Sequence, residues 1–270
     1  MRNLFIKLIG IKKVRTVIKF LHLHTLGNWW LRRFPVIKTL PGSGIRYRAC
    51  RGDSVALAVE IFEHGQVYSL AGLPENIRTF ADLGCNVGFF TCWLCDQLKT
   101  TQLKGLMVDA NAEAVEDARW QVAANGLNDV QVLHGLAGTR TDTGEATFFL
   151  HATNVNSTAV PTDASLQEAF TWKKVSVPCL SLEEQWSKFF GGENCDLLKV
   201  DIEGSELDLF RNETIFLRRV QAIIVEWHKW KVTLAEVEQA LVAQGFSLKS
   251  TMAEDARCGT AIFLRAAAAR

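Results

Sequence analysis

Hydrophobic and polar positions follow two rhythms that alternate along most of the chain. Short apolar runs typical of strands are followed by segments with helical spacing of their apolar residues. The strand-like runs cover 79–84, 105–110, 129–135, 196–204, 220–228, 246–250 and 260–265, and the helical segments between them cover 87–98, 112–126, 205–210 and 234–245. Strands that alternate with helices lie parallel and are joined by right-handed crossovers. The pattern therefore predicts an α/β fold with a Rossmann-like, doubly wound, mostly parallel sheet whose last strand is antiparallel.

The front of the chain has a different pattern. Residues 11–23 carry an apolar stripe opposite a face of lysine and arginine, which is typical of an amphipathic helix, and Trp29 and Trp30 follow it. The turn-forming stretch Leu-Pro-Gly-Ser-Gly then precedes a short strand at 45–48 and a helix at about 53–63. We therefore divide the chain into a basic amphipathic N-terminal segment at 1–44, which forms a helical extension, and a globular domain at 45–270.

Charge is distributed unevenly between these two parts. Twelve Lys and Arg residues lie between Met1 and Gly52, and no Asp or Glu occurs before Asp53. The whole chain of 270 residues nevertheless has a net charge of only +1, so no nucleic-acid partner is expected. A basic amphipathic helix followed by tryptophans suits a peripheral contact of residues 1–40 with an anionic membrane, or packing on the domain or on a second copy in a homodimer.

The composition also indicates where the protein works. No apolar run reaches the roughly 20 residues of a membrane-spanning helix, and lysines interrupt any signal-peptide core. A cytoplasmic location, with peripheral membrane contact as an option, follows as the expectation. The seven cysteines are then expected to be free thiols, and the C-x-x-C pair Cys92 and Cys95 to be buried helix residues.

The first strong motif is the glycine turn Asp-Leu-Gly-Cys-Asn-Val-Gly after the strand at 79–84. It lacks the Gly-Lys-Ser/Thr of a triphosphate-binding loop. It also fits a dinucleotide fingerprint poorly, because Phe89 stands where the third glycine would allow close packing. The spacing that it does match is D-x-G-x-N-x-G, which suits a cofactor without a pyrophosphate.

Two acidic residues indicate which cofactor that is. Asp82, beside the turn, can receive an ammonium group, although it could also be a helix cap or a surface carboxylate. Asp109 ends the next strand, where a carboxylate accepts both hydroxyls of a ribose. A ligand with an amino-acid tail and a ribose is S-adenosylmethionine. The predicted cofactor-binding residues are Asp82, Gly84, Asn86, Gly88, Asp109 and Ala137.

The fourth strand and its helix carry a longer motif. The stretch Leu-Leu-Lys-Val-Asp-Ile-Glu-Gly-Ser-Glu-Leu-Asp-Leu-Phe at 197–210 resembles the signature of the FkbM family of class I methyltransferases, and so does the form of the glycine turn. The resemblance extends from about Ile45 to the last strand. It departs at Val-Asp-Ala-Asn, where Asp109 stands in place of the glutamate of a usual Glu-Pro, and at the basic front, which matches nothing in the family.

The resemblance implies a methyltransferase domain at 45–270 that uses S-adenosylmethionine for O-methylation. Acceptors in this family are hydroxyls of sugars, glycolipids, polyketides or similar secondary metabolites. The alternatives are a non-catalytic binding or scaffold protein that keeps the fold and, more remotely, a nicotinamide dehydrogenase. The partner is accordingly expected to be a small-molecule, glycan or lipid acceptor.

Candidate catalytic residues lie at the ends of the fourth and fifth strands. They are Lys199, Asp201, Glu203 and His228. A lysine inside a central strand needs a partner, so Lys199 is expected to lie against Asp201, Glu203 or Glu226, either as a structural ion pair or to orient the acceptor. Asp201 or His228 is the predicted general base.

Three further features remain open. Asp201, Glu203 and His228 could hold a divalent metal, although no metal site is predicted. His134 is expected to be a core or adenine-edge residue. The polar stretch at 151–160, with Asn154, Asn156 and Ser157, is either an acceptor loop or a solvated connection.

Overall fold

The computed structural model describes residues 23–65, 67–151, 157–159 and 172–266. Residues 11–22 of the helix predicted at 11–23, and the loop residues Asn154 and Asn156, therefore lie outside the described residues. A central sheet of seven strands in the order β11-β12-β10-β9-β3-β4-β5 dominates the described part. Its strands are β3 (Thr79–Leu83), β4 (Lys104–Asp109), β5 (Val130–His134), β9 (Cys195–Val200), β10 (Val220–His228), β11 (Phe246–Glu254) and β12 (Cys258–Arg265).

The strand directions follow the predicted pattern. The pairs β4–β5, β3–β4, β3–β9 and β9–β10 are parallel, and β12 runs antiparallel to both of its neighbours. The predicted antiparallel last strand is thus confirmed. Because the chain leaves β3 in one direction through β4 and β5 and returns to its other side through β9, the sheet order reverses at β3. Ligands of open α/β sheets bind at such a reversal, outside the carboxyl ends of the strands.

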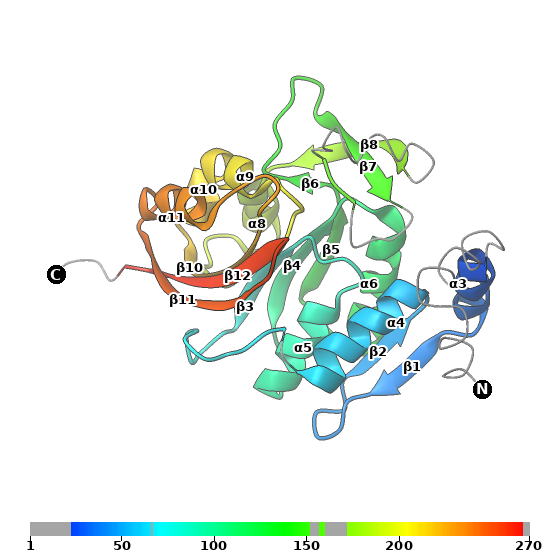
Figure 1. Cartoon of the computed structure of the whole chain (residues 1–270). Coiled ribbons are helices and arrows are strands. Elements are labelled where there is room, and N and C mark those ends of the chain that lie inside the picture. The colour runs from blue at the N-terminus through cyan, green and yellow to red at the C-terminus, as the bar shows by residue number, and fades with distance from the viewer. Residues whose placement is uncertain (1–22, 66, 152–156, 160–171, 267–270) are drawn as a thin grey trace.

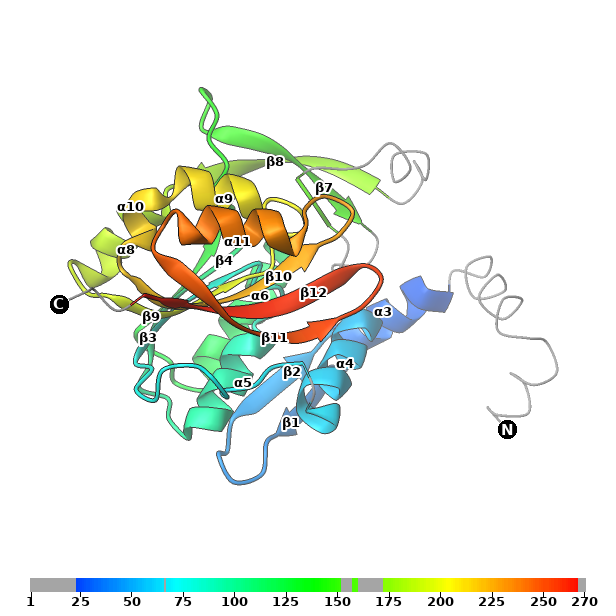
Figure 2. The same ribbon diagram turned by 60° about the vertical axis from the view of Figure 1, so that its left-hand side comes forward.

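Helices cover both faces of this sheet (Figures 1 and 2). One face carries α4 (Gly52–Ala58), the π-helical turn η1 (Val59–His64), α5 (Phe89–Leu98) and α6 (Ala112–Ala124), and the other carries α8 (Leu182–Phe190), α9 (Glu206–Asn212), α10 (Thr214–Leu217) and α11 (Leu234–Val242). Strand residues alternate between the two layers, so that Phe80 belongs to the first hydrophobic core and Ala81 to the second. Both cores are needed because a parallel sheet is buried on both sides.

A second sheet, absent from the sequence prediction, stands near the carboxyl ends of the central strands. It has three strands in the order β6-β8-β7, formed by β6 (Leu136–Ala137), β7 (Glu145–His151) and β8 (Trp172–Leu180). β7 and β8 form an antiparallel pair, and Figure 1 shows them beyond the end of β5. Phe148 and Val177 are the buried residues of its small core, together with Ala110 and Leu136.

The front of the described chain packs on the first helical layer. Helix α3 (Leu23–Arg33) is followed by β1 (Val36–Thr39), which pairs antiparallel with β2 (Arg46–Ala49). The predicted boundary at 44/45 therefore falls within this hairpin. The Asn28 Oδ1 atom accepts a hydrogen bond from the Gly52 backbone N–H at the start of α4 (2.9 Å), which ties α3 to the domain.

Candidate functional site

The site is a cavity of about 1010 Å³ at the carboxyl ends of β3, β4, β9 and β10. Its size lies at the upper end of the range found for small-molecule sites, roughly 300–1,000 Å³. Of the predicted site residues, the cavity is lined by Gly84, Asn86, Asp109, Ala137, Lys199, Asp201, Glu203 and His228. Residues predicted from two distant halves of the sequence thus meet in one place. Asp82 and Gly88 lie behind the lining.

The glycine turn fits closely against the end of β9. Gly84 has φ +69°, and a Cβ atom added there would lie 1.7 Å from the Asp201 carbonyl oxygen. Only glycine allows the turn and the end of β9 to approach this closely. Gly88 has φ +84°, and an added Cβ would come within 3.2 Å of the Ala118 Cα atom on α6. Gly88, one position before Phe89, therefore allows a close approach of the turn to a helix.

The Asp109 carboxylate fixes the backbone around the cavity. Its Oδ2 atom accepts a hydrogen bond from the Asn86 N–H (2.7 Å) and its Oδ1 atom accepts one from the Asn111 N–H (2.8 Å). Burial raises the pKa of this carboxyl group, while the two backbone donors lower it. Each carboxylate oxygen has a second lone pair, so both can still accept a bond from a ligand hydroxyl. This arrangement fits a ribose in the predicted position.

Asp82 and Lys199 form a buried ion pair behind the turn. The Lys199 Nζ atom lies 3.3 Å from Asp82 Oδ1 and 3.4 Å from Asp201 Oδ2, and it donates a hydrogen bond to the Gly84 carbonyl oxygen (2.8 Å). Burial lowers the pKa of Lys199, but Asp82 and Asp201 outweigh burial and hold it well above its ordinary value. The predicted contact of Lys199 with Asp201 is confirmed. Because Asp82 is fully buried, Lys199 rather than a ligand ammonium group faces its carboxylate.

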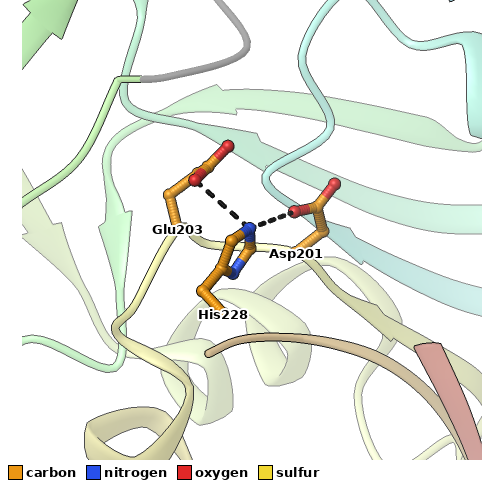
Figure 3. A group of neighbouring side chains, drawn as sticks. All are labelled: Asp201, Glu203 and His228. Atoms are coloured by element: carbon orange, nitrogen blue, oxygen red, sulfur yellow. Dashed lines mark ion pairs between the residues drawn. The ribbon is translucent and has the colours of Figure 1, made fainter. Parts of the chain in front are cut away.

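His228 lies in the middle of a group of carboxylates (Figure 3). Its Nδ1 atom is 2.7 Å from Glu206 Oε1, and its Nε2 atom is 3.2 Å from Glu203 Oε2 and 3.9 Å from Asp201 Oδ1. Glu226 Oε1 lies 3.7 Å from Nε2. Figure 3 shows Asp201 and Glu203 approaching the ring from opposite sides, so that both carboxylates converge on one nitrogen.

The backbone turn after β9 brings Glu203 to this ring. β9 ends at Val200, so the regular alternation predicted for Lys199, Asp201 and Glu203 stops before Glu203. Glu203 has φ +50° and Gly204 has φ +96°. Two successive residues in the left-handed region reverse the chain, and the Thr158 hydroxyl holds the turn by donating to the Glu203 carbonyl oxygen (2.6 Å).

Mutual repulsion and burial change the protonation of this group. Burial and the charges of Asp201 and Glu226 raise the pKa of Glu203 to about 8, against the opposing effect of His228. Asp201 and burial raise the pKa of Glu226 to about 7. Burial lowers the pKa of His228, but the hydrogen bond to Glu206 and the charges of Glu203 and Asp201 raise it to about 10. The surrounding carboxylates thus favour the protonated form of His228.

Comparison with known proteins identifies the family. A family described as "Methyltransferase FkbM domain" matches residues 48–248, which is most of the chain. The chain belongs to the FkbM methyltransferase family. The predicted family and the Rossmann-like fold are thereby confirmed. The family also confirms S-adenosylmethionine as the cofactor. A curated relative, "Methyltransferase sdnD" of Sordaria araneosa, is 26% identical over 211 residues, covering 69% of this chain and 80% of the relative.

Solved structures similar to this methyltransferase share little of its sequence. The FkbM methyltransferase of Methylobacillus flagellatus KT is 14% identical with a TM-score of 0.49, covering 74% of this chain and 47% of that one. TrmK of M. capricolum, solved with S-adenosyl-homocysteine, is 13% identical with a TM-score of 0.43, covering 73% of this chain and 65% of that one. This methyltransferase therefore spans less than two thirds of either chain.

Sequence reasoning about the FkbM methyltransferase missed two acidic partners. Glu206, in the first turn of α9, is fully buried and binds both the Gly204 N–H and His228. The only sign of this role in the sequence was the position of Glu206 within the stretch at 197–210 that resembles the family signature. Asp82 was assigned to a ligand, whereas the register of β3 against β9 sets it directly opposite Lys199. That register could not be known before the strand order.

The remaining predicted features have clear places. All seven cysteines are free, as predicted, and Cys92 and Cys95 are buried in α5. The Nε2 atom of His134 is 2.9 Å from the Ala110 carbonyl oxygen, which suits a structural position. Ser157 is buried and lines the cavity, so the described end of the polar stretch does reach the site. In the part of the chain that the structure describes, no helix is long and apolar enough to cross a membrane.

Proposed function

We propose that the methyltransferase transfers the methyl group of S-adenosylmethionine to a hydroxyl of a sugar, glycolipid, polyketide or related metabolite. The observation that carries this proposal is the cavity that joins the Asp109 end of β4 with the carboxylates after β9. Because methyl transfer to oxygen releases a proton, the acceptor must meet a group that takes it. The carboxylates of Asp201 and Glu203 are about a quarter exposed and line that cavity.

The cofactor would lie against the glycine turn. Asp109 would hold the ribose hydroxyls, and Gly84 and Asn86 would form the floor beneath the amino-acid tail. Asp82 would act through Lys199, which donates to the Gly84 carbonyl oxygen and so fixes the turn. When bound, S-adenosylmethionine supplies an electrophilic methyl group. Ala137, which lines the cavity beyond β5, would contact the adenine side.

The acceptor hydroxyl would enter from the side of the carboxylates. Its oxygen forms the new bond to the methyl carbon while the sulfur–carbon bond of the donor breaks, and its proton passes to the protein. A carboxylate of Asp201 is reached before the ring of His228, which is only 7% exposed and covered by Asp201 and Glu203. Of the two predicted candidates for the base, Asp201 is therefore favoured, because the surrounding carboxylates raise the pKa of His228 to about 10 and keep its ring protonated.

The test is turnover of a panel of hydroxylated sugars, glycolipids and polyketides with methyl-labelled S-adenosylmethionine. Asp201→Asn and His228→Ala should each retain cofactor binding, and the variant that lacks the base should lose about 10²–10⁴-fold in rate. Unchanged turnover in both variants would contradict these roles. Failure of the wild-type protein to bind S-adenosylhomocysteine at about 1 mM, a limit near 4 kcal/mol, would favour the non-catalytic scaffold alternative instead.

We also propose that α3 and the basic front place the enzyme at an anionic membrane surface. Four large apolar side chains of this region are exposed, namely Leu26 (60%), Trp29 (64%), Trp30 (56%) and Phe34 (53%). The Trp30 and Phe34 rings lie 4.5 Å apart, and Arg33 lies over the Phe34 ring at 5.7 Å. Exposed indole rings beside arginines suit the headgroup level of a bilayer. The alternative occupant of this surface is a second copy of the chain.

A further inference from the structure

The His228 ring turns its Nε2 atom toward a group of acids. The residue is only 6% exposed, and Glu206 accepts from its Nδ1–H, which fixes the ring orientation. Nε2 then points between Asp201 and Glu203 (Figure 3). Within the described ranges no hydrogen bond reaches Nε2, and its neighbours are carboxylate oxygens at 3.2–3.9 Å. Carboxylate oxygens this close together are stabilised by a shared proton or by a cation between them.

Lys199 does not supply that charge. Its ammonium group contacts the Oδ2 atom of Asp201, whereas Oδ1 faces His228. Lys199 also forms a buried ion pair with Asp82 on the far side, so Asp82 already balances the positive charge of Lys199. Five acidic residues of the described chain lie near Lys199 and His228. They are Asp82, Asp201, Glu203, Glu206 and Glu226. Acidic groups therefore outnumber bases around His228 and Lys199.

The side-chain atoms of Asp201, Glu203 and His228 are spaced like the ligands of a metal ion. One oxygen each from Asp201 and Glu203 and a nitrogen of His228 lie within 4.8 Å of one another. A small divalent ion with bonds of about 2.1 Å at right angles separates adjacent ligands by roughly 3 Å, close to the 3.2 Å between Glu203 Oε2 and His228 Nε2. A carboxylate that holds the opposite nitrogen of the ring, as Glu206 does, is the usual support of a metal-binding histidine.

We propose that Asp201, Glu203 and His228 bind a divalent transition-metal ion of the Mn²⁺ type at the acceptor end of the cavity. A mixed set of one imidazole and two carboxylates suits such an ion better than Mg²⁺, which prefers oxygen alone. Glu206 is a positioning residue that orients His228. The inference rests on the proposed function for its role, because the ion would bind the acceptor hydroxyl and promote loss of its proton. The other cation that could fill this place is a proton on Nε2.

The experiment measures Mn²⁺ binding to the metal-stripped full-length protein by electron paramagnetic resonance, with S-adenosylhomocysteine affinity measured in parallel. We expect one tight site in the wild type, loss of that site in Glu203→Gln and His228→Gln, and about 10–100-fold weaker binding in Glu206→Gln. Glu184→Gln, an exposed glutamate on α8, is the matched control and should bind Mn²⁺ as the wild type does. Unchanged S-adenosylhomocysteine affinity in the variants verifies that they are folded.

Two results would overturn the metal site. One is the absence of a tight Mn²⁺ site in a wild type that binds S-adenosylhomocysteine and methylates an acceptor equally well in EDTA, which would leave a proton as the occupant. The other is equal Mn²⁺ affinity in the wild type, Glu203→Gln and His228→Gln. A wild type that binds Mn²⁺ but transfers no methyl group would contradict the proposed function and leave the metal site standing.

Discussion

Single carboxylates in this methyltransferase have separate tasks that their contacts distinguish. Asp109 keeps both oxygens at the cavity wall while holding two backbone N–H groups, whereas Asp82 turns inward to a lysine. Glu206 supports a histidine from behind. Residue type alone is therefore a poor guide to role here, and each task predicts a different response to substitution.

Asp109→Ala should weaken S-adenosylhomocysteine binding about tenfold or more. The change removes charge-assisted hydrogen bonds to the ribose, each contributing roughly 1.5–3 kcal/mol, and it frees the Asn86 N–H that shapes the turn. Calorimetric titration measures the effect, with Asp142→Ala, at an exposed position, as the control. An affinity within about twofold of the wild type would exclude Asp109 as the ribose-binding residue.

Lys199→Met should lower the free energy of unfolding by about 3–5 kcal/mol, because it leaves the buried Asp82 carboxylate without its partner. Adding Asp82→Asn should restore part of that loss, since the uncompensated charge is then gone. Urea denaturation gives the values. Lys104→Met, which breaks an exposed ion pair with Glu193, should change stability by no more than about 1 kcal/mol. Equal effects of Lys199→Met and Lys104→Met would show that the buried pair has no special importance.

At the scale of elements, the site depends on how closely β9 approaches the turn after β3. The parallel register places Asp82 opposite Lys199, and the Asp201 N–H donates to the Leu83 carbonyl oxygen (3.0 Å). The two strand ends are thus held together by backbone bonds as well as by the ion pair. A side chain inserted between them should disrupt both the fold and the site.

Gly84→Ala tests this approach. The substitution should destabilise the protein strongly and abolish S-adenosylhomocysteine binding, because the new Cβ would collide with the Asp201 carbonyl oxygen. Gly126→Ala is the matched control, since Gly126 has a similar φ of +63° but open space around it. It should lose only about 1–2 kcal/mol, the cost of a left-handed alanine. Thermal unfolding that shifts equally in both variants would mean that backbone strain, and not crowding, makes Gly84 necessary.

At the scale of the whole molecule, the exposed aromatic side chains at α3 stand beside an arginine, since the Arg33 guanidinium lies over the Phe34 ring. The full-length protein should co-sediment with anionic vesicles but not with zwitterionic ones, and binding should fall steeply between low salt and about 0.5 M. Trp29→Ala combined with Trp30→Ala should abolish it. Ile215→Ala, at another exposed apolar position, should not. Binding that ignores lipid charge, or that survives the double substitution, would contradict a membrane role for this surface.

The local pattern of apolar and polar residues was sufficient to predict the strands of the central sheet. It was insufficient to predict which side chains contact one another between elements. All five predicted parallel strands exist, because a buried strand needs a continuous apolar run wherever it lies. The contact of Lys199 with Asp82 and that of His228 with Glu206 join residues of different elements, so only the strand register and the helix packing reveal them. The β6-β8-β7 sheet was missed because its two long strands are amphipathic and separated by a long polar stretch.

The position of β3 between β4 and β9 also determines when both edges of β3 can be paired during synthesis of the chain. β4 and β5 leave the ribosome soon after β3, but the Lys199 that holds Gly84 lies 115 residues further along the chain. Until β9 emerges, one edge of β3 is unpaired and Asp82 has no counterion, a state that favours association with other chains. A nascent chain that ends before β9 therefore lacks the strand and the lysine that complete its cofactor pocket.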